Sequence, residues 1–192
     1  MGYRKYHDAH PMTPNPERGN FMFNGSFVAL VTPFTDDDRL DVEALDALVD
    51  FHLRQGTDGL VVAGTTGESA TLGKDEFETL LAAVVRRAAG RIPVVAGTGS
   101  ASTAVAARQT RRAGELGADG VLVVTPYYVR PTQAGLRAHF TAVADAAAVP
   151  VILYNVPSRT AVDMLPETVA ALAAHPRIAG IKEAAGGQGR IE

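Results

Sequence analysis

Lys182 is the residue of this chain whose type and position most strongly suggest covalent chemistry. It directly follows the apolar run of residues 178–181, whereas the other two lysines, Lys5 and Lys74, stand in polar segments. An amine at the end of a parallel strand can lose its proton and attack a carbonyl carbon, which forms a Schiff base. The alternative is a charged side chain that only caps a strand end, and this residue alone does not decide between the two.

The surroundings of Lys182 must make the free amine accessible at neutral pH. From an ordinary pKa of ~10.4, deprotonation at pH 7 costs about 4.6 kcal/mol, and each unit by which the pKa falls recovers about 1.4 kcal/mol. Strand alternation places Gly180 and Ile178 on the same side as Lys182, and Glu183 on the other side. We therefore expect a dry pocket in which burial lowers the pKa of Lys182.

Polar residues that could assist this amine follow other apolar runs. The phenol of Tyr154 could move protons during Schiff-base formation, with the Thr65 hydroxyl and a second tyrosine as a relay. Arg159 could bind a carboxylate through two hydrogen bonds. The structural alternatives are an ordinary strand tyrosine, a hydroxyl that bonds within its own turn, and a solvated arginine. The segments concerned are residues 64–69 (GTTGES), 125–128 (TPYY), 154–160 (YNVPSRT) and 182–184 (KEA).

The glycine-rich segments do not match nucleotide-binding motifs. The backbone of residues 64–69 could point N–H groups at a carboxylate or a phosphate. However, the spacing from Gly67 to Gly73 is one residue too long for a phosphate-binding loop, and Asp75 stands where serine or threonine is required. Residues 97–99 (GTG) lack the third glycine of a dinucleotide fingerprint. We therefore expect no ATP, no NAD and no other cofactor.

Apolar runs alternate with amphipathic segments at intervals of about 30 residues, the length of a βα unit. Continuous apolar runs indicate strands whose two faces are both covered. Residues 74–89 carry an apolar stripe at helical spacing, and a second helix is expected from the cap residue Asp41 to the stop residue Gly56. The expected strands are residues 26–32, 59–63, 93–96, 120–124, 151–154 and 178–182.

These repeats predict an α/β fold with a parallel sheet, either an open doubly wound sheet or a (β/α)8 barrel. Both architectures place their sites at the C-terminal ends of the strands. A closed barrel needs eight strands and about 250 residues, so six units fit either an open sheet or a truncated barrel. Residues 1–22, rich in proline, histidine and charge, are expected to form a disordered extension, and residues 23–192 a single domain.

The composition excludes several classes of partner. A net charge of -3 gives no basic field for nucleic acid. No apolar run approaches the ~20 residues of a membrane span. The absence of cysteine fits a cytoplasmic location, and His7 and His10 lack the companion ligands of a metal site. We therefore expect a small-molecule partner and no metal.

Four segments in this order resemble the dihydrodipicolinate synthase family, within the pyruvate-dependent lyase and synthase superfamily. The resemblance runs from about Phe23 to the end of the chain and implies a TIM (β/α)8 barrel, truncated here to about six βα units, without strands seven and eight. The matching segments are residues 64–72 (GTTGESATL), 125–128 with Arg130 and Pro131, 154–160 (YNVPSRT) and 180–184 (GIKEA).

The resemblance also implies roles for individual residues. Lys182 would form an imine with pyruvate, and Tyr154 would donate and accept protons. Thr65 and Tyr128 would complete the relay, with the tyrosine reaching across a dimer contact into the neighbouring subunit. The remaining expected site residues bind substrate: Thr66, with Gly64 and Gly67, would hold the pyruvate carboxylate, and Arg159 would select L-aspartate 4-semialdehyde by its carboxylate.

The activity implied is that of a class I lyase of lysine and diaminopimelate biosynthesis, which condenses these two substrates in a homo-oligomer, a dimer of dimers. One alternative is another aldolase of the superfamily, similar to N-acetylneuraminate lyase or acting on a sugar acid. A second alternative is a non-catalytic truncated fragment. Lysine-inhibited members carry two histidines, an asparagine and a glutamate where this chain has Lys74, Phe77, Ala101 and Val105, so we expect no feedback inhibition by lysine.

Overall fold

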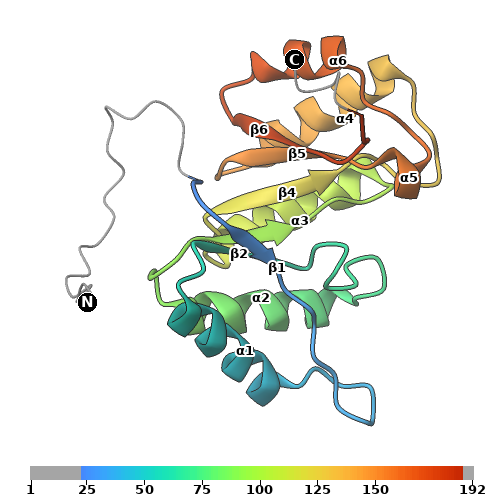
Figure 1. The fold of residues 1–192 in the computed structure, drawn as a ribbon. Helices are drawn as coiled ribbons and strands as arrows, with labels where there is room; N and C mark the ends of the chain where they lie inside the picture. Colours follow the sequence, from blue (N-terminus) through green and yellow to red (C-terminus); the bar gives the residue numbers. More distant parts are fainter. Residues whose placement is uncertain (1–22, 188–192) are drawn as a thin grey trace.

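The computed structural model describes residues 23–187 (Figure 1). The expected disordered extension, residues 1–22, lies outside the described residues, and so do Lys5, His7 and His10. From residue 23 onward, strands and helices alternate as the apolar periodicity predicts.

Six parallel strands form one sheet in sequence order, and all six expected strands are present. The largest difference lies in the first strand, which is three residues long. Its ladder continues for one more hydrogen bond, from Leu30 N to Val61 O, before the chain reaches Pro33, which has no N–H to donate. The strands are β1 (Phe27–Ala29), β2 (Gly59–Val62), β3 (Val94–Gly97), β4 (Gly120–Val124), β5 (Val151–Asn155) and β6 (Ile178–Glu183).

The first helix begins and ends at the cap residues that the sequence predicts. Asp41 accepts a hydrogen bond from Ala44 N at the start of α1, and Gly56 adopts a left-handed φ of 76° at its end. The second helix ends at Ala88, one residue before the predicted end. The helices are α1 (Val42–Gln55), α2 (Lys74–Ala88), α3 (Thr103–Glu115), α4 (Gln133–Ala146), α5 (Pro157–Thr160) and α6 (Pro166–Ala173).

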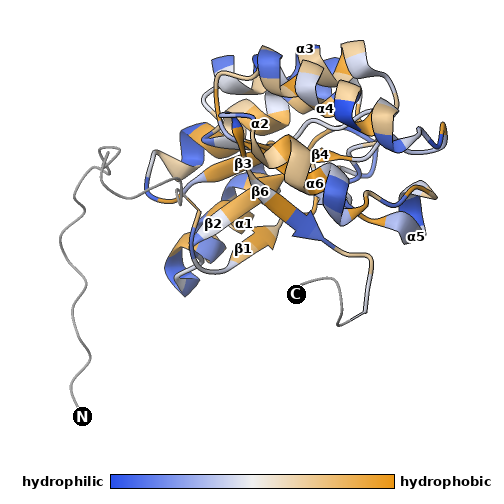
Figure 2. Cartoon of the chain, turned by 90° about the horizontal axis from the view of Figure 1, so that it is seen from above, coloured by the Kyte–Doolittle hydropathy of each residue, from blue (hydrophilic) through white to orange (hydrophobic). Residues whose placement is uncertain are grey.

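The main hydrophobic core lies between the sheet and the helices that follow one another around its outer face (Figure 1). The predicted stripe of α2 contributes Phe77, Leu80, Leu81 and Val84, all buried. The strands are largely hydrophobic, whereas the end of β6 is hydrophilic (Figure 2). Packing against the helices therefore holds the strands in place, and polar residues occupy the C-terminal ends of the strands.

The inner face of the sheet carries a second, smaller cluster, formed by Val95, Leu122, Tyr154 and Val156. The inner face is therefore packed by few buried side chains, in contrast to the outer one. Within residues 23–187, β1 pairs only with β2, and β6 pairs only with β5, so the sheet is a half-barrel. None of the helices in this part of the chain is long and apolar enough to cross a bilayer.

A β-bulge in the pairing of β5 with β6 corrects one prediction. Val151 pairs with Ile178, but the next residue, Ile152, pairs with Gly180. Strict alternation fails at a bulge, because one strand gains a residue relative to its partner. Ile178 consequently joins the outer core and does not share a side with Lys182.

Candidate active site

A cavity of about 200 Å³ lies at the C-terminal ends of the strands, and it contains most of the predicted site residues. It is bounded by β1, β2, β4, β5 and β6, by the loop after β2 and by α5. Its lining residues are Ala29, Val61, Gly64, Thr65, Thr66, Leu122, Tyr154, Arg159 and Lys182.

Tyr154 and Lys182 are register partners on β5 and β6. The Lys182 Nζ lies 4.6 Å from the centroid of the Tyr154 ring. The tyrosine is only 7% exposed and belongs to the inner cluster, so its ring is held in place by packing. An amine thus lies over the ring of a tyrosine at neighbouring strand ends, so the two side chains that a Schiff-base reaction with a proton shuttle needs are neighbours.

The predicted dry surroundings of Lys182 are wrong for the part of the chain that the structure describes. Lys182 is exposed, because β6 has a strand neighbour on one side only. Gly180, one pleat before it, has no atom within 4 Å of the position that a Cβ would take. Ile178, which was expected to help remove water from the amine, faces the outer core instead.

The loop after β2 presents the hydroxyls of Thr65 and Thr66 to the cavity. Among residues 23–187, neither hydroxyl has a hydrogen-bond partner in the protein, whereas Thr71 in the same loop donates to Glu68 O. A hydroxyl that bonds within its own turn is therefore the wrong interpretation for Thr65 and Thr66. Both are available to a bound molecule.

Gly67 shapes this loop and does not line the cavity. Its carbonyl accepts a hydrogen bond of 2.7 Å from the buried Thr32 hydroxyl, and its N–H donates to Gly64 O. A Cβ at this position would lie 2.9 Å from Leu30 O, closer than real Cβ contacts. The predicted substrate contact of Gly67 is replaced by a close approach of two backbone segments.

The other glycine-rich segment, residues 97–99, also serves packing. A Cβ on Gly97 would lie 1.9 Å from Ala63 O, and one on Gly99 would lie 2.6 Å from Val124 N. Only glycine lets the backbone after β3 approach its two neighbours this closely. The segment thereby brings the ends of β2, β3 and β4 together beside the cavity.

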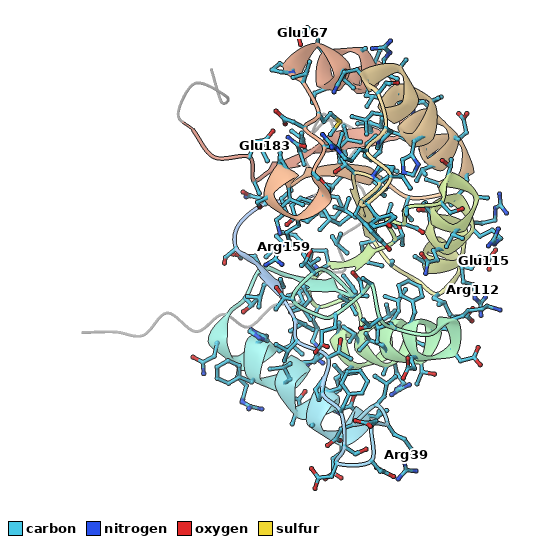
Figure 3. The ribbon with its side chains drawn as sticks, turned by 90° about the vertical axis from the view of Figure 1, so that its right-hand side faces the viewer. Arg39, Arg112, Glu115, Arg159, Glu167 and Glu183 are labelled. Carbon is cyan, nitrogen blue, oxygen red and sulfur yellow. The ribbon has the colours of Figure 1, made fainter. Side chains whose placement is uncertain are left out.

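Arg159 reaches the cavity from the single turn of α5. The adjacent Thr160 is 2% exposed and anchors this turn, because its hydroxyl shares its one hydrogen between Val156 O and Val162 O and accepts a hydrogen bond from Thr125. Figure 3 shows Arg159 on the same side of the molecule as Glu183, opposite Arg112 on α3. The guanidinium can therefore contact a carboxylate that enters from the strand ends.

Tyr128, like Gly67, is a predicted site residue that does not line the cavity. Its side chain is 91% exposed, and it adopts a φ of 70°, a left-handed conformation that is uncommon for a bulky residue. Val129 beside it is also exposed. Within the described chain, Tyr128 does not contribute to the same cavity as Tyr154 and Thr65.

Sequence reasoning missed Asn155, which is fully buried directly after Tyr154. Its side-chain amide donates to Asp163 at 2.9 Å and to both carboxylate oxygens of Glu183 at 3.1 Å. Its side-chain oxygen accepts a hydrogen bond from Met164 N. The available signal was the alternation of the strand, which turns Asn155 away from the cavity into the outer core, where an amide needs partners.

Most of the resolved pKa shifts belong to side chains on the helices. A hydrogen bond from Arg87 lowers the pKa of Asp50, and one from Arg112 lowers that of Glu78, so these pairs brace α1 against α2 and α2 against α3. Burial lowers the pKa of His139 on α4 to about 4. Within residues 23–187, no three histidines, cysteines or carboxylates gather into a metal-binding group.

Comparisons with known proteins match this arrangement. Residues 22–192 match the Dihydrodipicolinate synthetase family. A 4-hydroxy-tetrahydrodipicolinate synthase from Exiguobacterium is 56% identical over 165 residues, which cover 86% of this chain and 56% of that relative. The chain thus spans little more than half the length of the curated relatives it matches.

Two solved structures share the fold. The crystal structure of dihydrodipicolinate synthase from Aquifex aeolicus is 49% identical with a TM-score of 0.86, and the match covers 88% of this chain and 58% of that one. The chloride-inhibited dihydrodipicolinate synthase from Acinetobacter baumannii, complexed with pyruvate, is 48% identical with a TM-score of 0.85, over 86% of this chain and 57% of that one. The six strands and their helices therefore correspond to part of a TIM barrel.

Proposed function

Since this chain belongs to the dihydrodipicolinate synthetase family, we propose that the whole protein is a 4-hydroxy-tetrahydrodipicolinate synthase, which condenses pyruvate with L-aspartate 4-semialdehyde. The observation that carries the proposal is the shared cavity of Lys182, Tyr154, Thr65, Thr66 and Arg159 at the strand ends. These side chains bring a nucleophile, a proton shuttle and a cation that can bind a carboxylate into one cavity.

The first step forms the imine. The Lys182 nitrogen attacks the keto carbon of pyruvate, and the keto oxygen takes up a proton to give a carbinolamine. Loss of water, with a second proton passed to the departing oxygen, gives the protonated imine. In this proposal Tyr154 moves these protons, and Thr66 holds the pyruvate carboxylate. The solved relative from Acinetobacter baumannii is a complex with pyruvate, which supports the choice of keto acid.

The second step forms the carbon–carbon bond. Loss of a methyl proton converts the imine into an enamine, whose carbon attacks the aldehyde carbon of L-aspartate 4-semialdehyde, while the aldehyde oxygen gains a proton. Attack by the amino group of the acceptor on the imine carbon then closes the ring and releases Lys182. Arg159 binds the carboxylate of the acceptor and thereby selects it over neutral aldehydes.

The whole protein would complete what the described chain leaves open. Two further strands of the barrel would cover the exposed side of β6 and remove water from Lys182. Tyr128, held outward in a left-handed conformation, would reach the site of a second subunit in a homo-oligomer. A cytoplasmic location is consistent with a sequence that contains no cysteine.

A panel of acceptors tests this function against that of a sugar-acid aldolase. The whole protein is supplied with pyruvate and, in separate assays, L-aspartate 4-semialdehyde, N-acetylmannosamine and short neutral aldehydes. We expect product only with the semialdehyde, and Arg159→Ala to raise KM for it far more than KM for pyruvate. Turnover of a sugar aldehyde in preference to the semialdehyde would contradict the proposal.

A further inference from the structure

The ends of β5 and β6 are joined by side chains on the face opposite the cavity. Asn155 and Glu183 are register partners, one residue beyond the pair Tyr154 and Lys182. Successive side chains of a strand point to opposite faces. The bridge from the Asn155 amide to the Glu183 carboxylate therefore lies directly behind the two residues that face the cavity.

Further contacts fix this bridge at both ends. The Asn155 carbonyl accepts a hydrogen bond of 2.8 Å from Ala184 N, and the Glu183 carboxylate accepts one of 2.7 Å from Ala185 N, so the chain after Lys182 is tied to β5. The Asn155 side chain also binds Asp163 and Met164 in the connection between α5 and α6. The amide nitrogen and oxygen of this buried side chain are thus both hydrogen-bonded, to partners in two separate segments, β6 and the connection between α5 and α6.

We propose that Asn155 and Glu183 are positioning residues, whose side-chain bridge holds the Lys182 amine against Tyr154. The inference rests on the proposed function, because it assigns the bridge to the alignment of the imine-forming pair. The bridge ties the residue after Lys182 to the residue after Tyr154, so it fixes β6 against β5 directly beside the pair that faces the cavity. A misplacement of about 1 Å lowers the rate of a positioned reaction by up to about a hundredfold.

Four variants of the whole protein separate positioning from a general loss of stability. Asn155→Ala and Glu183→Ala break the bridge, whereas Glu183→Gln keeps an oxygen that accepts from Asn155 and Ala185. Thr110→Val is the matched control, because Thr110 is fully buried and its hydroxyl, among residues 23–187, pairs with Thr98 and not with a residue of the bridge. The readouts are the melting temperature, the rate of pyruvate trapping by borohydride at saturating pyruvate, and KM for pyruvate.

We expect Asn155→Ala and Glu183→Ala to slow trapping by roughly tenfold to a hundredfold, with KM for pyruvate changed by less than about twofold, since Thr66 is untouched. Glu183→Gln should recover most of the rate, and Thr110→Val should melt earlier yet trap pyruvate at the original rate. Trapping at the original rate in both alanine variants, or an equal loss in Thr110→Val, would overturn the proposal. If the unaltered protein traps no pyruvate, the proposed function itself fails.

Discussion

The two faces of the sheet differ in how they are built and in what they do. The outer face is sealed by helices, and large side chains such as Leu80, Leu136 and Phe140 are completely or almost completely buried there. The inner face and the strand ends hold a cavity, an exposed lysine and the hydroxyls of Thr65 and Thr66, which have no partner among the described residues. The difference shows that the outer layer provides stability, while the strand ends remain free to bind a molecule.

Truncation of a large side chain in the outer core gives the strongest test of this difference between the two faces. Phe140→Ala should lower the free energy of unfolding by about 3–5 kcal/mol, because it removes a fully buried ring and leaves a cavity. Val61→Ala, at the partly buried cavity wall, should cost less than about 1.5 kcal/mol. Denaturant titrations measure both values, and equal costs for the two variants would remove the distinction between the faces.

A buried histidine in the outer core, His139, should make the stability of the protein depend on pH. His139 is 4% exposed, its Nδ1 lies 2.9 Å from the Thr103 hydroxyl, and its Nε2 is buried without a partner. Because burial lowers its pKa from 6.5 to about 4, the unfolded chain binds the extra proton between these values. Stability should therefore fall by up to about 3 kcal/mol as the pH drops from 6.5 to 4.

A His139→Gln variant isolates this contribution. Glutamine keeps a polar contact with Thr103 and cannot take up the proton, so the part of the pH dependence between 6.5 and 4 that belongs to His139 should disappear. Unfolding titrations at a series of pH values provide the measurement. The same pH dependence in both proteins would show that another group titrates.

At the strand ends, Thr160 anchors the turn that carries Arg159, so a substitution of Thr160 should affect substrate binding more than stability. Thr160→Val preserves volume but removes the hydroxyl bonds that hold α5, so KM for the aldehyde acceptor should rise about three- to tenfold. The control is Thr168→Val, at a threonine that is also 2% exposed but bonds to Gln133, away from Arg159. If both variants raise this KM equally, the anchor has no special link to the substrate.

The smallest effect is expected from L-lysine, which should leave the rate unchanged at millimolar concentration. Lys74, one of the positions at which this chain differs from lysine-inhibited members, is an exposed cation. Its carboxylate neighbour Glu78 is already held by Arg112 at 2.7 Å. Phe77 is buried in the core and offers no polar contact. A second cation therefore meets the positive charge of Lys74 and a Glu78 carboxylate that Arg112 already holds. A clear inhibition curve would contradict this expectation.

The fold could be predicted from the sequence because the sequence signals that specify it are local. Apolar runs, the helical stripe of α2 and the cap residues Asp41 and Gly56 act within one element, and their consequences appear in the structure. The cavity was predictable for a related reason. Parallel strands bring their C-terminal ends together, so residues that follow different strands, such as Thr65, Tyr154 and Lys182, meet there.

What could not be predicted depends on contacts between elements. The β-bulge that moves Ile178 to the outer core follows from the pairing of β5 with β6, which no residue pattern within β6 reveals. The role of Gly67 in a close approach to Leu30 requires the relative positions of two loops. The bridge from Asn155 to Glu183 joins residues 28 positions apart, so it became visible only in three dimensions.

Borohydride trapping shows directly whether Lys182 forms an imine with pyruvate. The whole protein is incubated with pyruvate, reduced with sodium borohydride, digested and analysed by mass spectrometry, with Lys182→Arg as the matched variant. The account predicts a 1-carboxyethyl group on Lys182 in the unaltered protein and none in the variant. An adduct on Lys5 or Lys74, or no adduct at all, would contradict it.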